Sequence, residues 1–118
     1  MISMREAYEK IGADYDGASV RLMGEEMLAR FALKFLDDES MDKFEAAMAA
    51  GDAESAFMAV HTLKGVSQNL GFDNLYEPAV VVTEALRDAD TVDGARDGLH
   101  ALRQQYTATM SALREVAE

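Results

Sequence analysis

A histidine, a lysine and a glycine lie close together in the middle of the chain, as His61, Lys64 and Gly65. Residues three and four positions apart share one face of a helix, so a helix here would bring these positions together. An imidazole is a good nucleophile near neutral pH and can take up a phosphoryl group on a ring nitrogen. A lysine one turn later can offset charge on the phosphoryl oxygens. A glycine in a helix interior costs about 1 kcal/mol relative to alanine, so we expect the empty space beside the histidine to have a use.

A helix is the expected structure of this stretch because apolar residues recur every three or four positions. The stripe that faces the core comprises Ala56, Val60, Leu63, Ser67 and Leu70. His61 lies outside this stripe, on the adjoining face with Phe57 and Gln68, and we therefore expect its ring to be exposed. Ser67 faces the core, and its hydroxyl is expected to bond a carbonyl one turn back.

The segment His61-x-Leu63-Lys64-Gly65-x-Ser67-x-x-Leu70-Gly71 resembles the phospho-acceptor signature of histidine-containing phosphotransfer (HPt) domains, the carriers of phosphorelays. Weaker similarity extends over about residues 20–90. The resemblance implies that His61 accepts the phosphoryl group on the ring nitrogen farther from the backbone. It also implies that Lys64 stabilises the phosphoryl charge and that Gly65 leaves room for the active-site loop of a partner.

The same resemblance implies supporting residues around the acceptor. Gln68 is a candidate contact for the phosphate or the partner. By the spacing typical of the family, Arg87 lines the site, and Thr83 occupies the position whose side chain fixes the inner ring nitrogen. Glutamine or glutamate is usual there. A threonine side chain is too short to reach His61 directly across packed helices spaced about 8–10 Å apart.

Four apolar residues are candidates for the surface on which a partner docks, and they are Phe57, Met58, Leu22 and Met23. Methionine suits surfaces that meet more than one partner because its side chain is flexible and polarisable. The alternative for these residues is ordinary bundle core.

Length and composition indicate one soluble all-helical domain over residues 1–118. The chain has no cysteine, so disulfides and thiolate metal sites are excluded, and its net charge of −11 argues against nucleic acid and anionic membranes as partners. Neither a targeting segment nor an apolar run of about 18 residues is seen, so we expect a cytoplasmic protein without a membrane span.

Local signals divide the chain into helices. A capping box at Ser3 and Glu6 starts a short helix that Gly12 ends, and residues 15–17 are expected to form a turn. The next helices are expected at 25–36, with Phe31 facing the core, at 41–50 after a Ser40 cap, and at 53–70 after an Asp52 cap. A turn at 72–74 then leads into a helix up to Leu86, in which regular hydrogen bonding is expected to begin only near Pro78. The last helix is expected at 92–117. We predict an antiparallel up-down four-helix bundle with short extra helices at the N-terminal end.

The predicted function is that of a phosphocarrier, which takes a phosphoryl group from a receiver-domain aspartate and passes it to another receiver domain. The expected partners are response-regulator receiver domains and a sensor (hybrid) histidine kinase, with the carrier itself a monomer. Mg²⁺ is expected in the partner receiver domain, and no cofactor or metal is expected in this chain. The alternative is a helical adaptor that docks on receiver or kinase domains without being phosphorylated.

Enzymatic alternatives are weaker. No phosphate-binding loop for a nucleotide is present, so we do not expect a kinase or another enzyme. His61 and His100 are the only histidines. Asp97 and His100 have the spacing of a metal-binding pair, but two ligands do not make a site. A metal-dependent helical enzyme would need a bound metal in the purified protein.

Overall fold

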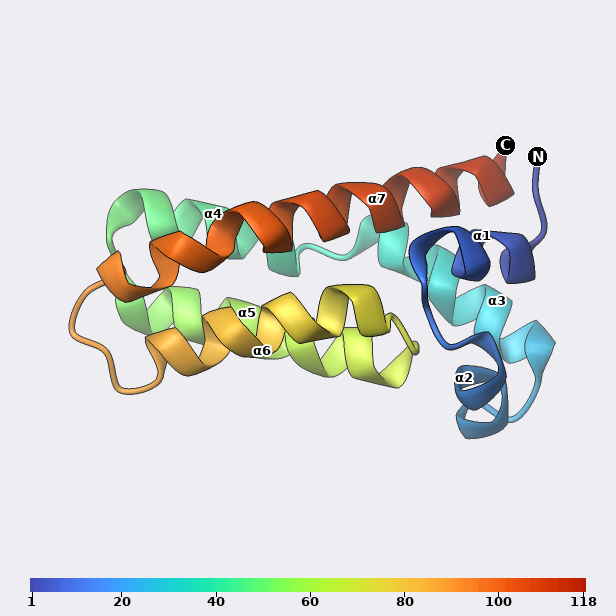
Figure 1. Cartoon of the computed structure of the whole chain (residues 1–118), viewed down its shortest axis with the longest axis horizontal. Helices are drawn as coiled ribbons and strands as arrows, with labels where there is room; N and C mark the ends of the chain where they lie inside the picture. The colour runs from blue at the N-terminus through green and yellow to red at the C-terminus, as the bar shows by residue number, and fades with distance from the viewer.

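The computed structural model describes residues 1–118 and consists of helices and connecting turns, without a strand (Figure 1). The helices, in chain order, are α1 (Met4–Ile11), α2 (Tyr15–Arg21), α3 (Glu25–Lys34), the 3₁₀ helix η1 (Phe35–Asp37), α4 (Ser40–Ala50), α5 (Ala53–Asn69), α6 (Asp73–Leu86), the 3₁₀ helix η2 (Asp93–Gly98) and α7 (Leu99–Ala117). The all-helical prediction is confirmed.

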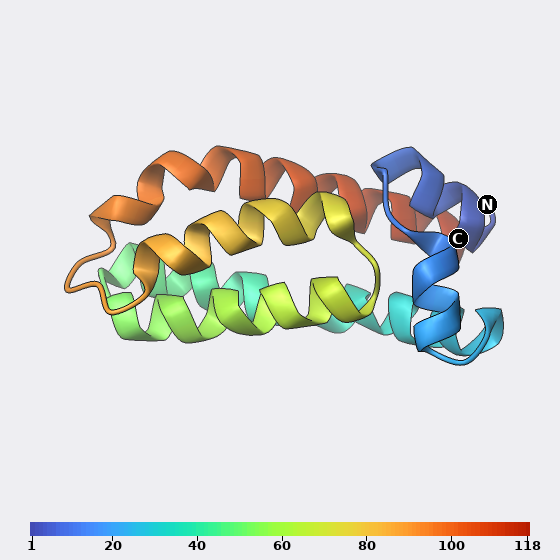
Figure 2. The ribbon, with the colours of Figure 1, turned by 60° about the horizontal axis from the view of Figure 1, so that its bottom comes forward.

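The last four α-helices form an antiparallel bundle in which each helix runs back along the one before it, as Figures 1 and 2 show. The connection between α4 and α5 is tight because Gly51 adopts a left-handed conformation (φ +69°) that ends α4, and Asp52 caps α5 directly after it. On the far side, Arg103 of α7 donates twice to the Glu45 carboxylate of α4, each time at 2.8 Å. The predicted up-down four-helix bundle is therefore confirmed.

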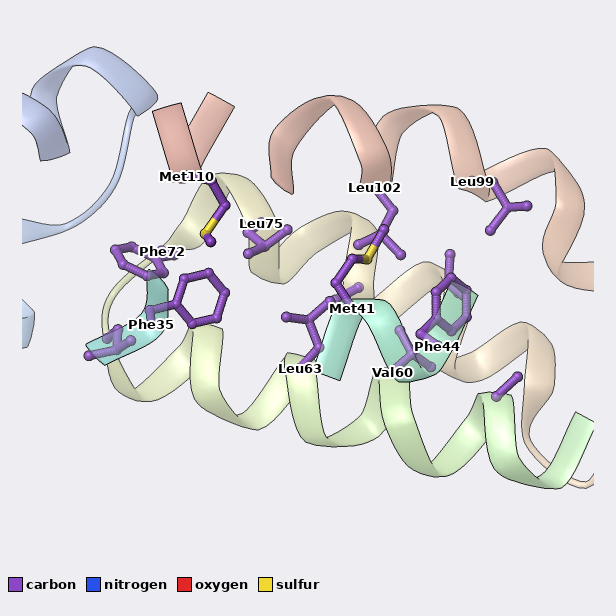
Figure 3. Packing of buried hydrophobic residues seen from close by; sticks show 14 of the residues in the cluster. Phe35, Met41, Phe44, Val60, Leu63, Phe72, Leu75, Leu99, Leu102 and Met110 are labelled. Atoms are coloured by element: carbon purple, nitrogen blue, oxygen red, sulfur yellow. The ribbon is translucent and has the colours of Figure 1, made fainter. Parts of the chain in front are cut away.

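One apolar core runs through the bundle and under the N-terminal helices. Figure 3 shows side chains from facing helices meeting in the bundle interior, among them Val60, Leu63, Met41, Phe44, Leu99 and Leu102. Val60 and Leu63 come from α5 and are fully buried. Because both lie on one stripe of α5, their burial fixes the rotation of this helix and turns its opposite face outward.

The three N-terminal helices cover one end of the bundle, beside the turn between α5 and α6 (Figure 2). The turn is held by Tyr8, whose hydroxyl donates to the Leu70 carbonyl at 2.7 Å, and by Asp14, whose N–H donates to the Gly71 carbonyl at 2.8 Å. Gly71 has φ +73°, and a Cβ there would lie 2.5 Å from the Asp14 carbonyl oxygen. Only glycine fits this close approach, so the end of α5 is firmly placed.

Replacing Tyr8 with phenylalanine should lower the free energy of unfolding by about 1–2 kcal/mol, because the buried Leu70 carbonyl would lose its donor. Burial raises the pKa of the Tyr8 phenol, so the hydroxyl keeps its proton and can donate across the accessible pH range. Urea unfolding monitored by circular dichroism would measure the change. Tyr76→Phe is the matched control, since the Tyr76 hydroxyl makes no hydrogen bond, and an equal loss in both variants would contradict the role of the Tyr8 bond.

Two predicted boundaries were wrong because hydrogen bonds form earlier than the residue types suggested. Residues 15–17 begin α2 rather than a turn, since the Asp14 carboxylate accepts the Gly17 N–H at 3.0 Å and caps the helix. Helix α6 starts at Asp73, five residues before Pro78, because the Phe72 carbonyl accepts the N–H groups of Leu75 and Tyr76. A proline removes only its own donor, so the turn before it can still form.

Other differences lie at helix ends. The expected helix 92–117 begins as the 3₁₀ helix η2 and becomes α-helical only at Leu99. Gly94 and Gly98 both lie before this point, and glycine weakens α-helix formation. The helix expected at 25–36 ends at Lys34 and continues as η1, and Phe31 is 37% exposed rather than fully in the core. The predicted cap at Ser40 is wrong, because the Asp38 carboxylate accepts the Ser40 N–H at 3.0 Å and Ser40 is the first helical residue.

Candidate functional site

Helix α5 carries the candidate acceptor and is well defined at both ends. Asp52 accepts the Ser55 N–H at 3.1 Å and the Ser55 hydroxyl at 2.7 Å, and these bonds lower the pKa of its carboxyl. At the other end, Arg21 donates to the carbonyls of Gln68 (3.0 Å) and Asn69 (3.2 Å). A cation beside the carbonyls of a helix C-terminus is favourable, so α2 stabilises the end of α5.

The His61 side chain is exposed on this helix, as its place outside the core stripe predicts. Its ring lies against that of Phe57, one turn earlier, with 5.6 Å between the centroids and 38° between the planes. The Arg87 guanidinium lies over the Phe57 ring, 5.3 Å from its centroid. Phe57 is partly buried, so an anchored aromatic ring supports an otherwise exposed imidazole.

In the turn of α5 after His61, Lys64 forms no ion pair and Gly65 is surrounded by free space. Lys64 is partly buried, and its ammonium is in none of the ion pairs of the structure. A Cβ built on Gly65 would meet nothing within 4 Å. The face beside His61 therefore holds an uncommitted cation and free space, which is the arrangement that an incoming phosphoryl group would need.

Glu84 is a nearby residue that sequence reasoning missed. Its carboxylate accepts two hydrogen bonds from Arg87, one from Nε at 3.1 Å and one from the terminal nitrogen at 2.9 Å. These bonds lower the pKa of the Glu84 carboxyl, and the nearby charges of Arg87 and Lys64 lower it further. The spacing Glu84-x-x-Arg87 on a predicted helix was the available signal, because such pairs lie on one face.

Thr83 lies in the core and not on the surface beside the histidine. It is fully buried, and its hydroxyl donates to the Ala79 carbonyl of its own helix at 2.7 Å. It makes no hydrogen bond to His61. The implied role of this position in fixing the inner ring nitrogen therefore has no direct contact to support it.

Two polar residues of α5 differ in their surroundings. Ser67 is fully buried as predicted, but its hydroxyl has no hydrogen-bond partner, so the expected bond to a carbonyl one turn back is wrong. Gln68 is exposed on the face of His61, two turns further along. Seven residues span about 10.5 Å of helix, so the Gln68 side chain lies well beyond the imidazole in the direction of α2.

The four candidate docking residues lie on either side of His61 rather than in one cluster. Met58 is 62% exposed and lies near the start of α5 with Phe57. Leu22 is partly buried and Met23 is 89% exposed, and both follow Arg21, which bonds the far end of α5. The structure thus places a pair of candidates before the histidine and a pair beyond it.

The remaining site chemistry is simple. No group of three or more histidine, aspartate or glutamate side chains is arranged to hold a metal ion, and His100 is an exposed residue of α7. None of the helices combines the length and the apolar character that crossing a bilayer requires. What the site offers is one exposed imidazole, cations beside it and open space.

A four-helix bundle with an exposed histidine in the middle of a long helix is the arrangement expected of a histidine phosphotransfer protein. The family model of the Hpt domain matches residues 26–115, which is more than half of the chain, and the chain therefore belongs to the Hpt domain family. The match leaves α1 and α2 outside it. No curated protein and no solved structure gave a significant match.

Membership of this family confirms the predicted class. Hpt domains are phosphotransfer carriers and not kinases, so the chain has the general role of a phosphocarrier in a phosphorelay. Receiver domains and histidine kinases are the partners that this role implies.

Proposed function

We propose that His61 accepts a phosphoryl group from the aspartyl phosphate of one receiver domain and passes it to the aspartate of another. The lone pair of the outer ring nitrogen, Nε2, attacks phosphorus, and the bond from phosphorus to the aspartate oxygen breaks with its electron pair left on the carboxylate. The proton stays on Nδ1. Onward transfer reverses these changes with the second aspartate as the nucleophile, and each partner supplies its own acidic pocket and Mg²⁺.

One observation carries this proposal, namely that His61 is exposed beside an unpaired ammonium and an empty position. Lys64 lies one turn after the histidine and forms no ion pair, so its ammonium can approach the phosphoryl oxygens. The open space at Gly65 lets the backbone of a partner come close to the imidazole. Positioning and charge stabilisation are the main requirements of phosphoryl transfer, and these residues supply both.

The charge distribution supports docking on an acidic partner. The chain has a net charge of −11, yet residues 55–72 contain neither aspartate nor glutamate. This segment includes almost all of α5 after its first turn. A receiver pocket built from carboxylates would be repelled by most of the surface but less by this stretch of α5. We infer that the absence of carboxylates here favours the productive orientation of the partner.

We infer further that the partner contacts α5 on both sides of the histidine. Phe57 and Met58 would meet it on one side, and Leu22 and Met23 on the other. In Figure 1, α2 lies beyond the end of α5 and α6, on the side of these helices away from α7. A partner that covers His61 could therefore contact the turn after α2 as well.

Replacing Lys64 with alanine should slow phosphotransfer about ten-fold or more, because the ammonium no longer offsets the charge of the phosphoryl group. The free energy of unfolding should change by no more than about 0.5 kcal/mol. Rapid-quench measurements with a phosphorylated receiver domain would give the rate. Arg114→Ala, which removes an exposed and unpaired cation from α7, is the control, and equal rates in both variants would remove the electrostatic role of Lys64.

The proposal is tested by incubating the purified chain with radiolabelled, phosphorylated receiver domains of the same organism and sampling at short times. We expect acid-labile label on the chain with at least one donor, and its onward transfer to a second receiver domain. ATP and Mg²⁺ without any partner should give no label. Self-phosphorylation, or failure with every receiver domain, would contradict the carrier function.

A further inference from the structure

Glu84, in the last turn of α6, pairs with Arg87, the residue that directly follows this helix, and both lie on the side of the histidine. Arg87 binds both oxygens of the Glu84 carboxylate, at 2.9 and 3.1 Å, in the fork geometry that suits a carboxylate or a phosphate equally well. Both side chains are about half exposed, at 46% and 56%. The pair can therefore open without disturbing the core.

Contacts connect this pair to the acceptor. The Arg87 guanidinium lies 5.3 Å from the centroid of Phe57, and the Phe57 ring lies 5.6 Å from that of His61. Helices α5 and α6 run antiparallel, so moving back along the chain from Arg87 to Glu84 goes in the same direction as moving forward from Phe57 to His61. Glu84 is thus level with the acceptor turn of α5.

Lys64 is close enough to Glu84 to act on it electrostatically. The hydrogen bonds from Arg87 lower the pKa of the Glu84 carboxyl most, and the charges of Arg87 and Lys64 lower it further, so the carboxylate is ionised at neutral pH. One anion is therefore bonded to Arg87 and lies within electrostatic reach of Lys64. A phosphoryl group on His61 would bring a second anion with stronger acceptor oxygens to the same cations.

We propose that Glu84 competes with the phosphoryl group for Arg87, holding the guanidinium in the free carrier and releasing it when His61 is phosphorylated. This inference rests on the proposed function. Because forming phosphohistidine requires the Glu84 pair to open, the phosphoryl group is held less tightly than the two cations alone would allow. Glu84 thereby favours onward transfer over retention of the phosphoryl group.

The exchange can be observed on the arginines by NMR. Phosphorylation of His61 should shift the Nε–H resonance of Arg87, which changes its partner from Glu84 to the phosphoryl group. Arg103 provides an internal control, because it makes the same two-point contact with Glu45 on the far side of the bundle. Its Nε–H resonance should stay in place. An unchanged Arg87 resonance in phosphorylated protein would overturn the proposal.

The energetic consequence can be measured as a transfer equilibrium. Glu84→Gln should shift the equilibrium with a phosphorylated receiver domain about two- to five-fold toward phosphorylated His61, the range expected for exposed charges. The shift should shrink in about 1 M salt, where the screening length is about 3 Å. Glu45→Gln removes one carboxylate from a matched arginine pair and should leave the equilibrium unchanged.

The outcomes separate this inference from the function on which it rests. If His61 takes up phosphate and Glu84→Gln has the same equilibrium as Glu45→Gln, the competitor role is wrong and the carrier function stands. If Glu84→Gln shifts the equilibrium toward the receiver domain, Glu84 assists the phosphorylated state and the proposal is overturned. If no receiver domain labels the parent chain, the proposed function itself fails.

Discussion

Replacing His61 with glutamine should abolish phosphate uptake completely and leave the fold intact. The amide has no nucleophilic ring nitrogen, so no bond to phosphorus can form. The side chain is exposed and lies outside the buried stripe of α5, and its ring lies against that of Phe57. Loss of one exposed ring contact should change the free energy of unfolding by no more than about 1 kcal/mol.

The chain offers a matched control for this experiment. His100 is the other histidine and is exposed on α7, so His100→Gln should keep full labelling by a phosphorylated receiver domain. Circular dichroism and urea unfolding of both variants would check the fold. Label that persists in His61→Gln would place the acceptor elsewhere, and a large loss of helicity would contradict the exposed position of the ring.

Replacing Gly65 with glutamine should separate stability from function. Open space surrounds the position, and glycine is the weakest helix former other than proline, so the variant should be more stable by about 0.5–1 kcal/mol. The long side chain would fill the space through which a partner reaches His61. Because displacement of the reacting groups by about 1 Å can cost 100-fold in rate, we expect transfer to fall by about 100-fold or more.

Two further variants make this result interpretable. Gly65→Ala should gain most of the helix stability while leaving more room, so its transfer rate should lie between those of the parent and Gly65→Gln. Ala101→Gln introduces the same side chain at an exposed position of α7 and should not affect transfer. If Gly65→Gln transfers phosphate at the parental rate, the glycine does not serve the approach of a partner.

Local sequence signals determined most of the architecture. The capping box at Ser3 and Glu6, the cap at Asp52 and the left-handed glycine at Gly51 all depend on neighbours within a few residues. The apolar stripe of α5 depends on helical periodicity alone, and it predicted the burial of Leu63 and the exposure of His61. These features follow from the chain itself because their causes lie within one helix or one turn.

Helix boundaries were less predictable where local hydrogen bonds and long-range packing together offset a weak local preference. Residues 15–17 and the turn before Pro78 are helical although their residue types favour a turn or a break. At α2, the bonds of Arg21 to Gln68 and Asn69 join parts of the chain that lie almost fifty residues apart. Propensity is a weak term beside such contacts, and sequence periodicity contains no record of them.

The surroundings of the acceptor were decided by tertiary structure. Thr83 and Glu84 are neighbours in sequence, and their side chains point about 100° apart around the axis of α6. Which of them faces solvent beside His61 depends on how α6 is rotated against α5, and burial of Val82 and Leu86 sets that rotation. Thr83 is consequently in the core, and Glu84 lies with Arg87 on the surface. The sequence by itself determined the acceptor helix, but only packing between helices determined which charged side chains surround the acceptor.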